Sequence, residues 1–200
     1  MGNYFVSYRG MSLINSLQNA KDINDVREIL STHFRRINQK DEADFTPLMW
    51  ASRENHIQIL TTLLEYGADV NDQTENGATA LMWAICWGHL EVVQLLVKWG
   101  ADINIPSVMG HTPIIVAIKE GYPLIAKYLI EQGADVNLHS NGSVTALMCA
   151  LISKNSSLVW QLMESGADLT ILTREGKTAL DYASEYDMLK EYFAYLFWQQ

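Results

Sequence analysis

Histidine is the side chain in this 200-residue sequence best suited to metal binding or proton transfer, and the five histidines are spread along the chain. His56 and His89 occupy the same position of a pattern that repeats every 33 residues, which favours a structural role. His111 and His139 fall near predicted loop tips of successive repeat units, where they could approach each other. Two histidines without a third ligand make a poor metal site. We therefore expect surface residues there and no metal centre.

The other groups capable of chemistry are two cysteines and a recurring aspartate. Cys86 and Cys149 lie in non-adjacent repeat units, so a disulfide between them is not expected, and sparse cysteine is typical of a reducing compartment. The sequence has no Cys-x-x-Cys pair, phosphate-binding loop or serine nucleophile elbow. The aspartate of the recurring Gly-Ala-Asp triplet is interpreted as a loop-fixing group that accepts backbone N–H bonds. We therefore expect a protein that is not an enzyme and needs no cofactor.

All these residues are placed by a pattern with a period of 33 residues. Five segments that begin with Thr and end with Ala carry it, at 46–51, 79–84, 112–117, 145–150 and 178–183. Gly-Ala-Asp keeps the same period at 67–69, 100–102, 133–135 and 166–168. A fixed period of this size predicts stacked repeat units, each of which buries its apolar face against its neighbours.

The unit 78–110 shows what each repeat is predicted to form. Thr79 is suited to cap a first helix by accepting a backbone N–H bond. Gly88 is expected to end that helix in the left-handed conformation that glycine tolerates best. A second helix with an apolar stripe is predicted over 90–98, and an extended loop with a turn follows. The unit is therefore helix, turn, helix and loop.

This order of motifs resembles the ankyrin repeat over about residues 12–200, with Thr-Pro-Leu-x-x-Ala followed by an apolar second helix and Gly-Ala-Asp-Val-Asn. The resemblance implies an all-α solenoid of stacked helix-turn-helix units joined by β-turn-like loops. We predict a flexible lead-in over 1–11, an N-terminal cap over 12–44, repeats at 45–77, 78–110, 111–143 and 144–176, and a C-terminal cap over 177–200. The resemblance also implies that the His56 and His89 side chains form hydrogen bonds to backbone at the turns.

Three residues depart from the glycine pattern. Asn55 and Lys154 replace the glycine that ends the first helix in the other full repeats. Asn accepts the left-handed conformation moderately well, whereas Lys would cost roughly 1 kcal/mol there. Ser143 replaces the turn glycine, with Gly142 one place early, so the turn before the repeat at 144–176 is expected to differ from the others.

The resemblance implies that the protein binds a protein partner through its concave face, meaning the loop tips and the first helices. Transferring that rule by position selects a partner-binding set: Arg53, Glu54, Glu75, Asn76, Cys86, Trp87, Val108, Met109, His111, Lys119, Glu120, Val144 and Ile152. The centre of this set is apolar and its edges are charged, which is the layout of a protein-binding hot spot with Trp87 as the anchor. The alternative for Trp87 is a lid folded over its neighbours. Trp50 and Trp83 are instead predicted to pack in the core.

The overall charge bears on which partners are plausible. A net charge of −9 and a pI of about 4.9 argue against nucleic acid and against an anionic membrane surface. No apolar run approaches the roughly 18 residues of a membrane span, and no signal-peptide pattern is visible. A cytoplasmic location is therefore expected, with a secreted bacterial effector that binds a host protein as one alternative.

Two further alternatives come from individual segments. The aromatic segment at 192–198 in the C-terminal cap favours a self-associating assembly protein, in which this cap forms a homo-oligomer. Asn71, Asn104 and Asn137 lie in stretches that resemble sites modified by asparagine hydroxylases in animal ankyrin proteins. The simpler interpretation is that these asparagines close the repeat loop.

Overall fold

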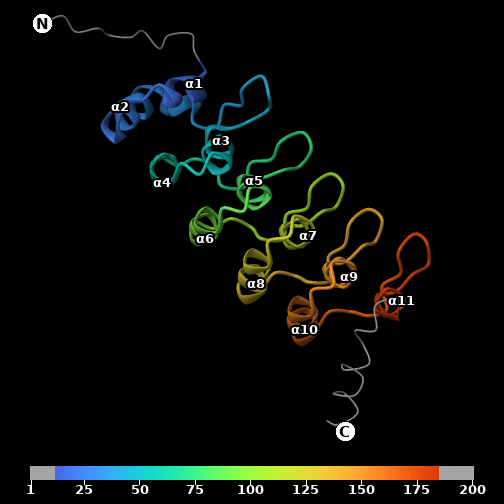
Figure 1. Cartoon of the computed structure of the whole chain (residues 1–200). Helices are drawn as coiled ribbons and strands as arrows, with labels where there is room; N and C mark the ends of the chain where they lie inside the picture. Colours follow the sequence, from blue (N-terminus) through green and yellow to red (C-terminus); the bar gives the residue numbers. More distant parts are fainter. Residues whose placement is uncertain (1–11, 185–200) are drawn as a thin grey trace, which may run out of the picture.

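A computed structural model of the chain describes residues 12–184, which form a row of paired helices with loops projecting to one side (Figure 1). The helix pairs are α1 (Leu13–Gln18) and α2 (Ile23–His33), α3 (Pro47–Arg53) and α4 (Ile57–Glu65), α5 (Ala80–Cys86) and α6 (Leu90–Lys98), α7 (Pro113–Lys119) and α8 (Pro123–Glu131), and α9 (Ala146–Ile152) and α10 (Ser156–Glu164). A 3₁₀ turn, Phe34–Arg36, follows α2, and α11 (Ala179–Ser184) follows the last loop. The predicted lead-in and the aromatic segment at 192–198 lie outside the described residues.

Threonine begins most of the first helices, as the repeat pattern predicted. Thr46, Thr79 and Thr145 each accept a backbone N–H bond from the residue three places later, at 3.2–3.3 Å. Thr112 differs, because its hydroxyl is buried and makes no hydrogen bond within residues 12–184. Pro113 follows it at the start of α7, where the fixed φ of proline suits the first turn of a helix.

The helix ends and the turns have left-handed residues at the predicted places. Gly88 ends α5 with φ of 71°, and Asn55 and Lys154 take the same conformation with φ of 59° and 55°. Ser143 has φ of 58°, close to the 74° of the turn glycine Gly110. The turn itself keeps the same hydrogen bond, because serine adopts the left-handed conformation in place of glycine: the N–H of Ser107 bonds to the carbonyl of His111, and that of Ser140 to the carbonyl of Val144, both at 3.0 Å. The expected difference lies only beside the turn, where His139 and Thr145 form an isolated β-bridge.

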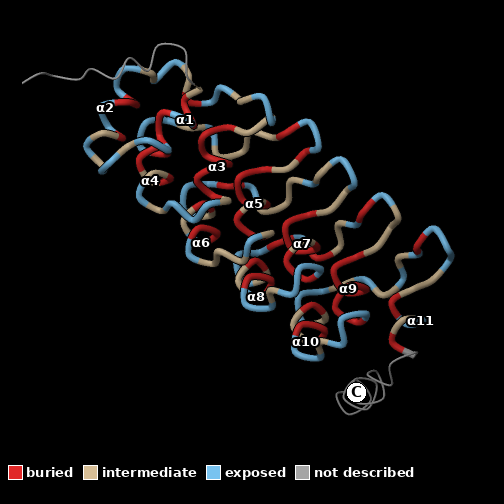
Figure 2. The backbone as a smooth tube through the Cα atoms, turned by 45° about the horizontal axis from the view of Figure 1, so that its top comes forward, coloured by how far each residue is buried: buried red, intermediate tan, exposed pale blue. Residues whose placement is uncertain are grey.

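The core lies between the first and second helices and runs from one end of the array to the other (Figure 2). Leu48, Leu81, Ile114 and Leu147 occupy the third position of the Thr-Pro-Leu motif, and each is at most 1% exposed. Full burial of such a side chain contributes about 1.5–3 kcal/mol. Exposed residues lie at the loop tips and at the outer ends of the helices (Figure 2).

A ladder of asparagine and aspartate side chains joins successive loops. The Asp69 carboxylate accepts the backbone N–H of Asn71 at 2.9 Å, which fixes the loop locally as predicted. The Asn71 side-chain carbonyl then accepts the backbone N–H of Asp102, in the next repeat, at 2.8 Å. The same bonds recur along the array, from Asn104 to the N–H of Asp135 at 2.9 Å.

Candidate protein-binding surface

The predicted partner-binding residues lie at the ends of the first helices or in the loops that precede them. The large apolar residues of this set are well exposed: Trp87 at 58%, Val108 at 62%, Met109 at 62% and Ile152 at 48%. Trp87 directly follows α5, where its backbone N–H bonds back to the last turn of the helix. The surface therefore presents several large apolar side chains to solvent in the middle of the array.

The loop tips are held to one another by backbone hydrogen bonds. The N–H of Val108 bonds to the carbonyl of Asn76 in the preceding loop at 2.9 Å. The N–H of Asn141 bonds in the same way to the carbonyl of Met109, also at 2.9 Å. The exposed side chains of these loops are thus carried on a backbone that is already ordered.

The N-terminal part of the concave face is covered by a cluster of rings and charges. The rings of Phe45 and Trp83 lie 4.6 Å apart between centroids, and the guanidinium carbon of Arg53 lies 5.0 Å from the centroid of Phe45. Arg53 also pairs with Glu54 at 2.7 Å. Arg53 is therefore engaged within the protein on two sides, whereas its predicted role was in partner binding.

The structure corrects the placement of one tryptophan. Trp50 is 5% exposed and belongs to the core, as predicted. Trp83 was predicted to be equally buried but is only partly buried, with its indole against Phe45 and its buried Nε1 without a hydrogen-bond partner in the described part of the chain. Trp83 is the fifth residue of its Thr-to-Ala segment, which we call the fifth motif position. Because this position lies at the edge of the core, the burial of its side chain depends on which neighbouring side chain covers it.

The two repeated histidines make different contacts. The Nε2 atom of His89 lies 3.0 Å from the backbone carbonyl oxygen of Arg53, which confirms the predicted bond to backbone and joins two repeats. His56 instead packs its ring 5.0 Å from that of Trp50. His89 therefore has the predicted structural role, whereas the exposed His56 makes a ring contact in place of the predicted backbone bond.

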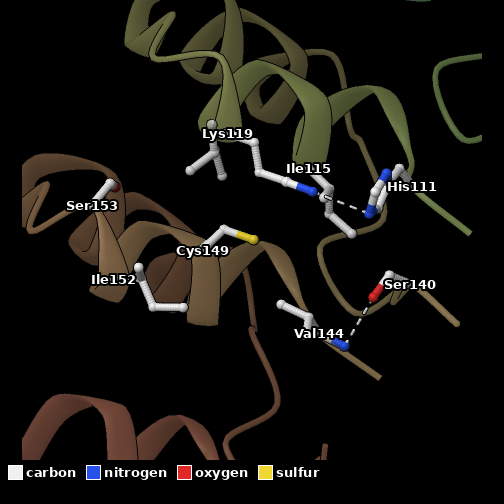
Figure 3. A pocket seen from close by; sticks show the side chains of 9 residues that line it. His111, Ile115, Lys119, Ser140, Val144, Cys149, Ile152 and Ser153 are labelled. Atoms are coloured by element: carbon white, nitrogen blue, oxygen red, sulfur yellow. Dashed lines mark hydrogen bonds between the residues drawn. The ribbon is translucent and has the colours of Figure 1, made fainter. Parts of the chain in front are cut away.

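A pocket of about 330 Å³ opens between α7 and α9 (Figure 3). The residues that line it are His111, Ile115, Ile118, Lys119, Ser140, Val144, Cys149, Ile152 and Ser153. Four of them, His111, Lys119, Val144 and Ile152, belong to the set predicted from sequence. The others were missed, although one signal was present: Cys149 occupies the motif position of Trp50 and Trp83, and its short side chain leaves space.

The polar groups of the pocket are mostly uncharged. The Lys119 ammonium donates toward Nε2 of His111 across 3.3 Å, and burial together with the Lys119 charge lowers the pKa of His111 below its usual value. Burial raises the pKa of Cys149 to about 11, against an opposing effect of Lys119. Because the thiolate is the reactive form of cysteine, this thiol is a poor nucleophile near neutral pH. The arrangement suits binding of an apolar group better than covalent chemistry.

These features define the class of protein as a helical repeat solenoid. The family model for ankyrin repeats, which describes three copies of the repeat, matches residues 13–107, 72–140 and 101–173. The chain belongs to the ankyrin-repeat family. A search of curated protein sequences gives no match. Ankyrin repeats are generally protein–protein interaction modules, and the family is typically non-catalytic. Within residues 12–184, every helix is too short or too polar to cross a bilayer.

Proposed function

We propose that this protein is a non-catalytic module that holds a protein partner on its concave face. The observation that carries the proposal is the group of exposed apolar side chains on neighbouring loops and first helices, above all Trp87 at 58% exposure. Large exposed apolar groups beside charged ones mark interaction sites, and Trp is strongly enriched among hot-spot residues. The partner-binding set predicted from sequence remains the proposed contact surface.

The loop-to-loop hydrogen bonds suggest how such a surface gains affinity. Because Val108 and Asn141 are tied to the preceding loops through their backbone N–H groups, little loop ordering is left to occur on binding. Ordering an interface opposes association, so a prestacked surface retains more of its contact energy. The two cysteines are free thiols, which is compatible with a reducing compartment, and we propose the cytoplasm as the location.

The test is affinity capture from the native cell with the wild-type chain and with Trp87→Ala. We expect the substitution to weaken binding of the captured partner by about 2 kcal/mol or more, as truncation of a hot-spot residue does. The thermal midpoint of the protein should barely change, because most of the Trp87 side chain is in solvent.

Trp50→Ala is the matched control, because the same residue type lies in the core there. It should destabilise the fold by about 3–5 kcal/mol. A Trp87→Ala protein that keeps both its stability and its full affinity for the partner would contradict the proposed anchor. Light scattering of the purified chain tests the alternative of self-association, which a monomer over the working concentration range would oppose.

A further inference from the structure

The pocket between α7 and α9 occupies a place that aromatic rings fill two repeats earlier. Between α3 and α5, the Trp83 indole packs 4.6 Å from the ring of Phe45, and the Arg53 guanidinium lies 5.0 Å from that ring. This cluster shows what the geometry of the array accepts at that place: an aromatic ring, a second ring beside it, and a cation at the end of the first helix.

The same three positions two periods later are His111, Lys119 and Cys149. The Lys119 Nζ atom lies 3.3 Å from Nε2 of His111, so a cation again lies beside the loop ring, although it meets a ring nitrogen where Arg53 lies over the ring face of Phe45. The residue missing from this later cluster is the tryptophan, because Cys149 stands at the position of Trp83. Cys149, whose thiol points into the pocket, leaves a space of about 330 Å³ (Figure 3).

The walls of this space are suited to an aromatic side chain. Ile115, Val144 and Ile152 form apolar sides, and the volume is at the low end of the roughly 300–1,000 Å³ of small-molecule sites. An aromatic side chain removes about 150–250 Å² of surface from water when it is buried, which makes it the most effective single group for such a pocket.

The charge at the rim adds a second requirement. Lys119 is exposed and forms no ion pair with a carboxylate among the described residues, in contrast to Arg53, which pairs with Glu54. In a protein with a net charge of −9, an unneutralised ammonium beside an apolar pocket is a local site for a negative group.

We propose that this pocket receives an aromatic side chain of the partner protein, with a neighbouring carboxylate of the same segment paired to Lys119. The inference rests on the proposed function and names the chemistry of the segment that is bound. In the complex, the partner's ring takes the place in this interface that Trp83 takes between α3 and α5.

The experiment uses N-acetyl-tryptophan, which carries an indole and a carboxylate, and N-acetyl-tryptophan amide, which lacks the charge. Each is titrated into the full chain while the backbone amide signals are followed by NMR. We expect saturable shifts at Ile115, Val144 and Cys149, with the carboxylate probe binding about twofold to fivefold tighter, as an exposed ion pair allows. Equal affinity of the two probes overturns the carboxylate part, and absence of saturable shifts at the pocket overturns the proposal.

Substitutions make the test specific. Cys149→Trp places in the chain the residue found at the equivalent position 83 and should weaken both probes at least tenfold. Ile152→Glu changes an exposed wall residue and should weaken both as well, so the test does not depend on one folded variant. Lys119→Gln should remove only the preference for the carboxylate, and Lys98→Gln, at an exposed lysine that ends α6 outside the partner-binding set, should change neither affinity. Full probe affinity in Cys149→Trp would overturn the assignment.

The same variants separate this inference from the proposed function. If Trp87→Ala weakens binding of the native partner and Cys149→Trp does not, the concave face binds the partner but the pocket assignment is wrong. If the probes bind at the pocket while neither variant affects the partner, the pocket is an aromatic site and the proposed contact surface is wrong.

Discussion

At the scale of single residues, the left-handed positions show how the array uses side chains other than glycine. Asp44, Asn55, Ser143 and Lys154 all have φ between 55° and 64°. Asp44 gains from its side chain, because its carboxylate accepts the backbone N–H of Glu75 in the next loop. This bond and an ion pair with Lys40 lower the pKa of Asp44 despite some desolvation. A strained conformation is thus offset there by a bond between repeats.

Lys154→Gly should stabilise the protein by roughly 1 kcal/mol, because a lysine in the left-handed region is strained and glycine is not. Asn55→Gly, at the same repeat position, should give a smaller gain because Asn tolerates that conformation better. Urea denaturation measures both. A lower midpoint for Lys154→Gly would mean that contacts of the lysine side chain outweigh the strain.

His111 is expected to make stability depend on pH. Its pKa is lowered in the folded protein by burial and by Lys119, so the unfolded chain binds the proton more readily. Stability should therefore fall as the pH drops from about 6.5, the ordinary value for His, toward the folded pKa, and this loss is complete below it. His111→Phe, which copies Phe45, should show a smaller decrease in urea midpoint between pH 7.5 and pH 5. An identical decrease in both proteins would show that groups other than His111 cause the pH dependence of stability.

At the scale of elements, the sequence predicted the helices well because each is set by local residues. The second helix predicted over 90–98 is α6, Leu90–Lys98, between the left-handed Gly88 and Gly100. The exposure of Trp83 and the pocket at Cys149 were not predicted. Both depend on what a neighbouring repeat places over one motif position, and a period shows which residues are equivalent without showing which neighbour covers them.

The loops between elements are packed unequally along the array, and two turn glycines measure the difference. A Cβ added at Gly77 would lie 2.7 Å from the backbone nitrogen of Val108 in the next loop, whereas one added at Gly176 would meet nothing within 4 Å among residues 12–184. The two glycines have similar positive φ, at 76° and 73°, so placing an alanine in the left-handed conformation costs about the same free energy at both sites.

Gly77→Ala should therefore destabilise the protein clearly more than Gly176→Ala, since only the first displaces a neighbouring backbone. Thermal unfolding of the two variants gives the comparison. Equal losses would indicate that the loop of Val108 moves away from its neighbour without resistance.

At the scale of the whole molecule, the asparagine ladder couples successive repeats, in addition to their apolar contacts and the backbone hydrogen bonds between loop tips. Each unit of a solenoid contacts its neighbours alone, so bonds between neighbours decide how far unfolding spreads. Asn104 is central in this ladder, because its side chain accepts the N–H of Asp135 at 2.9 Å.

Asn104→Ala should destabilise the array by about 0.5–1.5 kcal/mol, the usual contribution of one hydrogen bond. The substitution should also lower the slope of the unfolding free energy against urea concentration if the two halves of the array begin to unfold separately. Asn76→Ala, at an exposed loop tip, is the control and should change neither quantity. An unaltered midpoint for Asn104→Ala would show that the apolar contacts and the loop-tip hydrogen bonds couple the repeats without the ladder.

The fifth residue of the Thr-to-Ala segment varies in size along the array, whereas the third residue does not. Trp83 and Cys149 differ greatly in size at equivalent places, while the deeply buried third-position residues Leu81 and Leu147 are the same. Under the proposed function, mutations at positions 83, 116 and 149 would therefore reshape the contact surface, whereas Trp50, at the same motif position, is buried in the core. Descendants of such a chain can acquire new partners one side chain at a time, and a library randomised at positions 83, 116 and 149 would sample many specificities on one backbone.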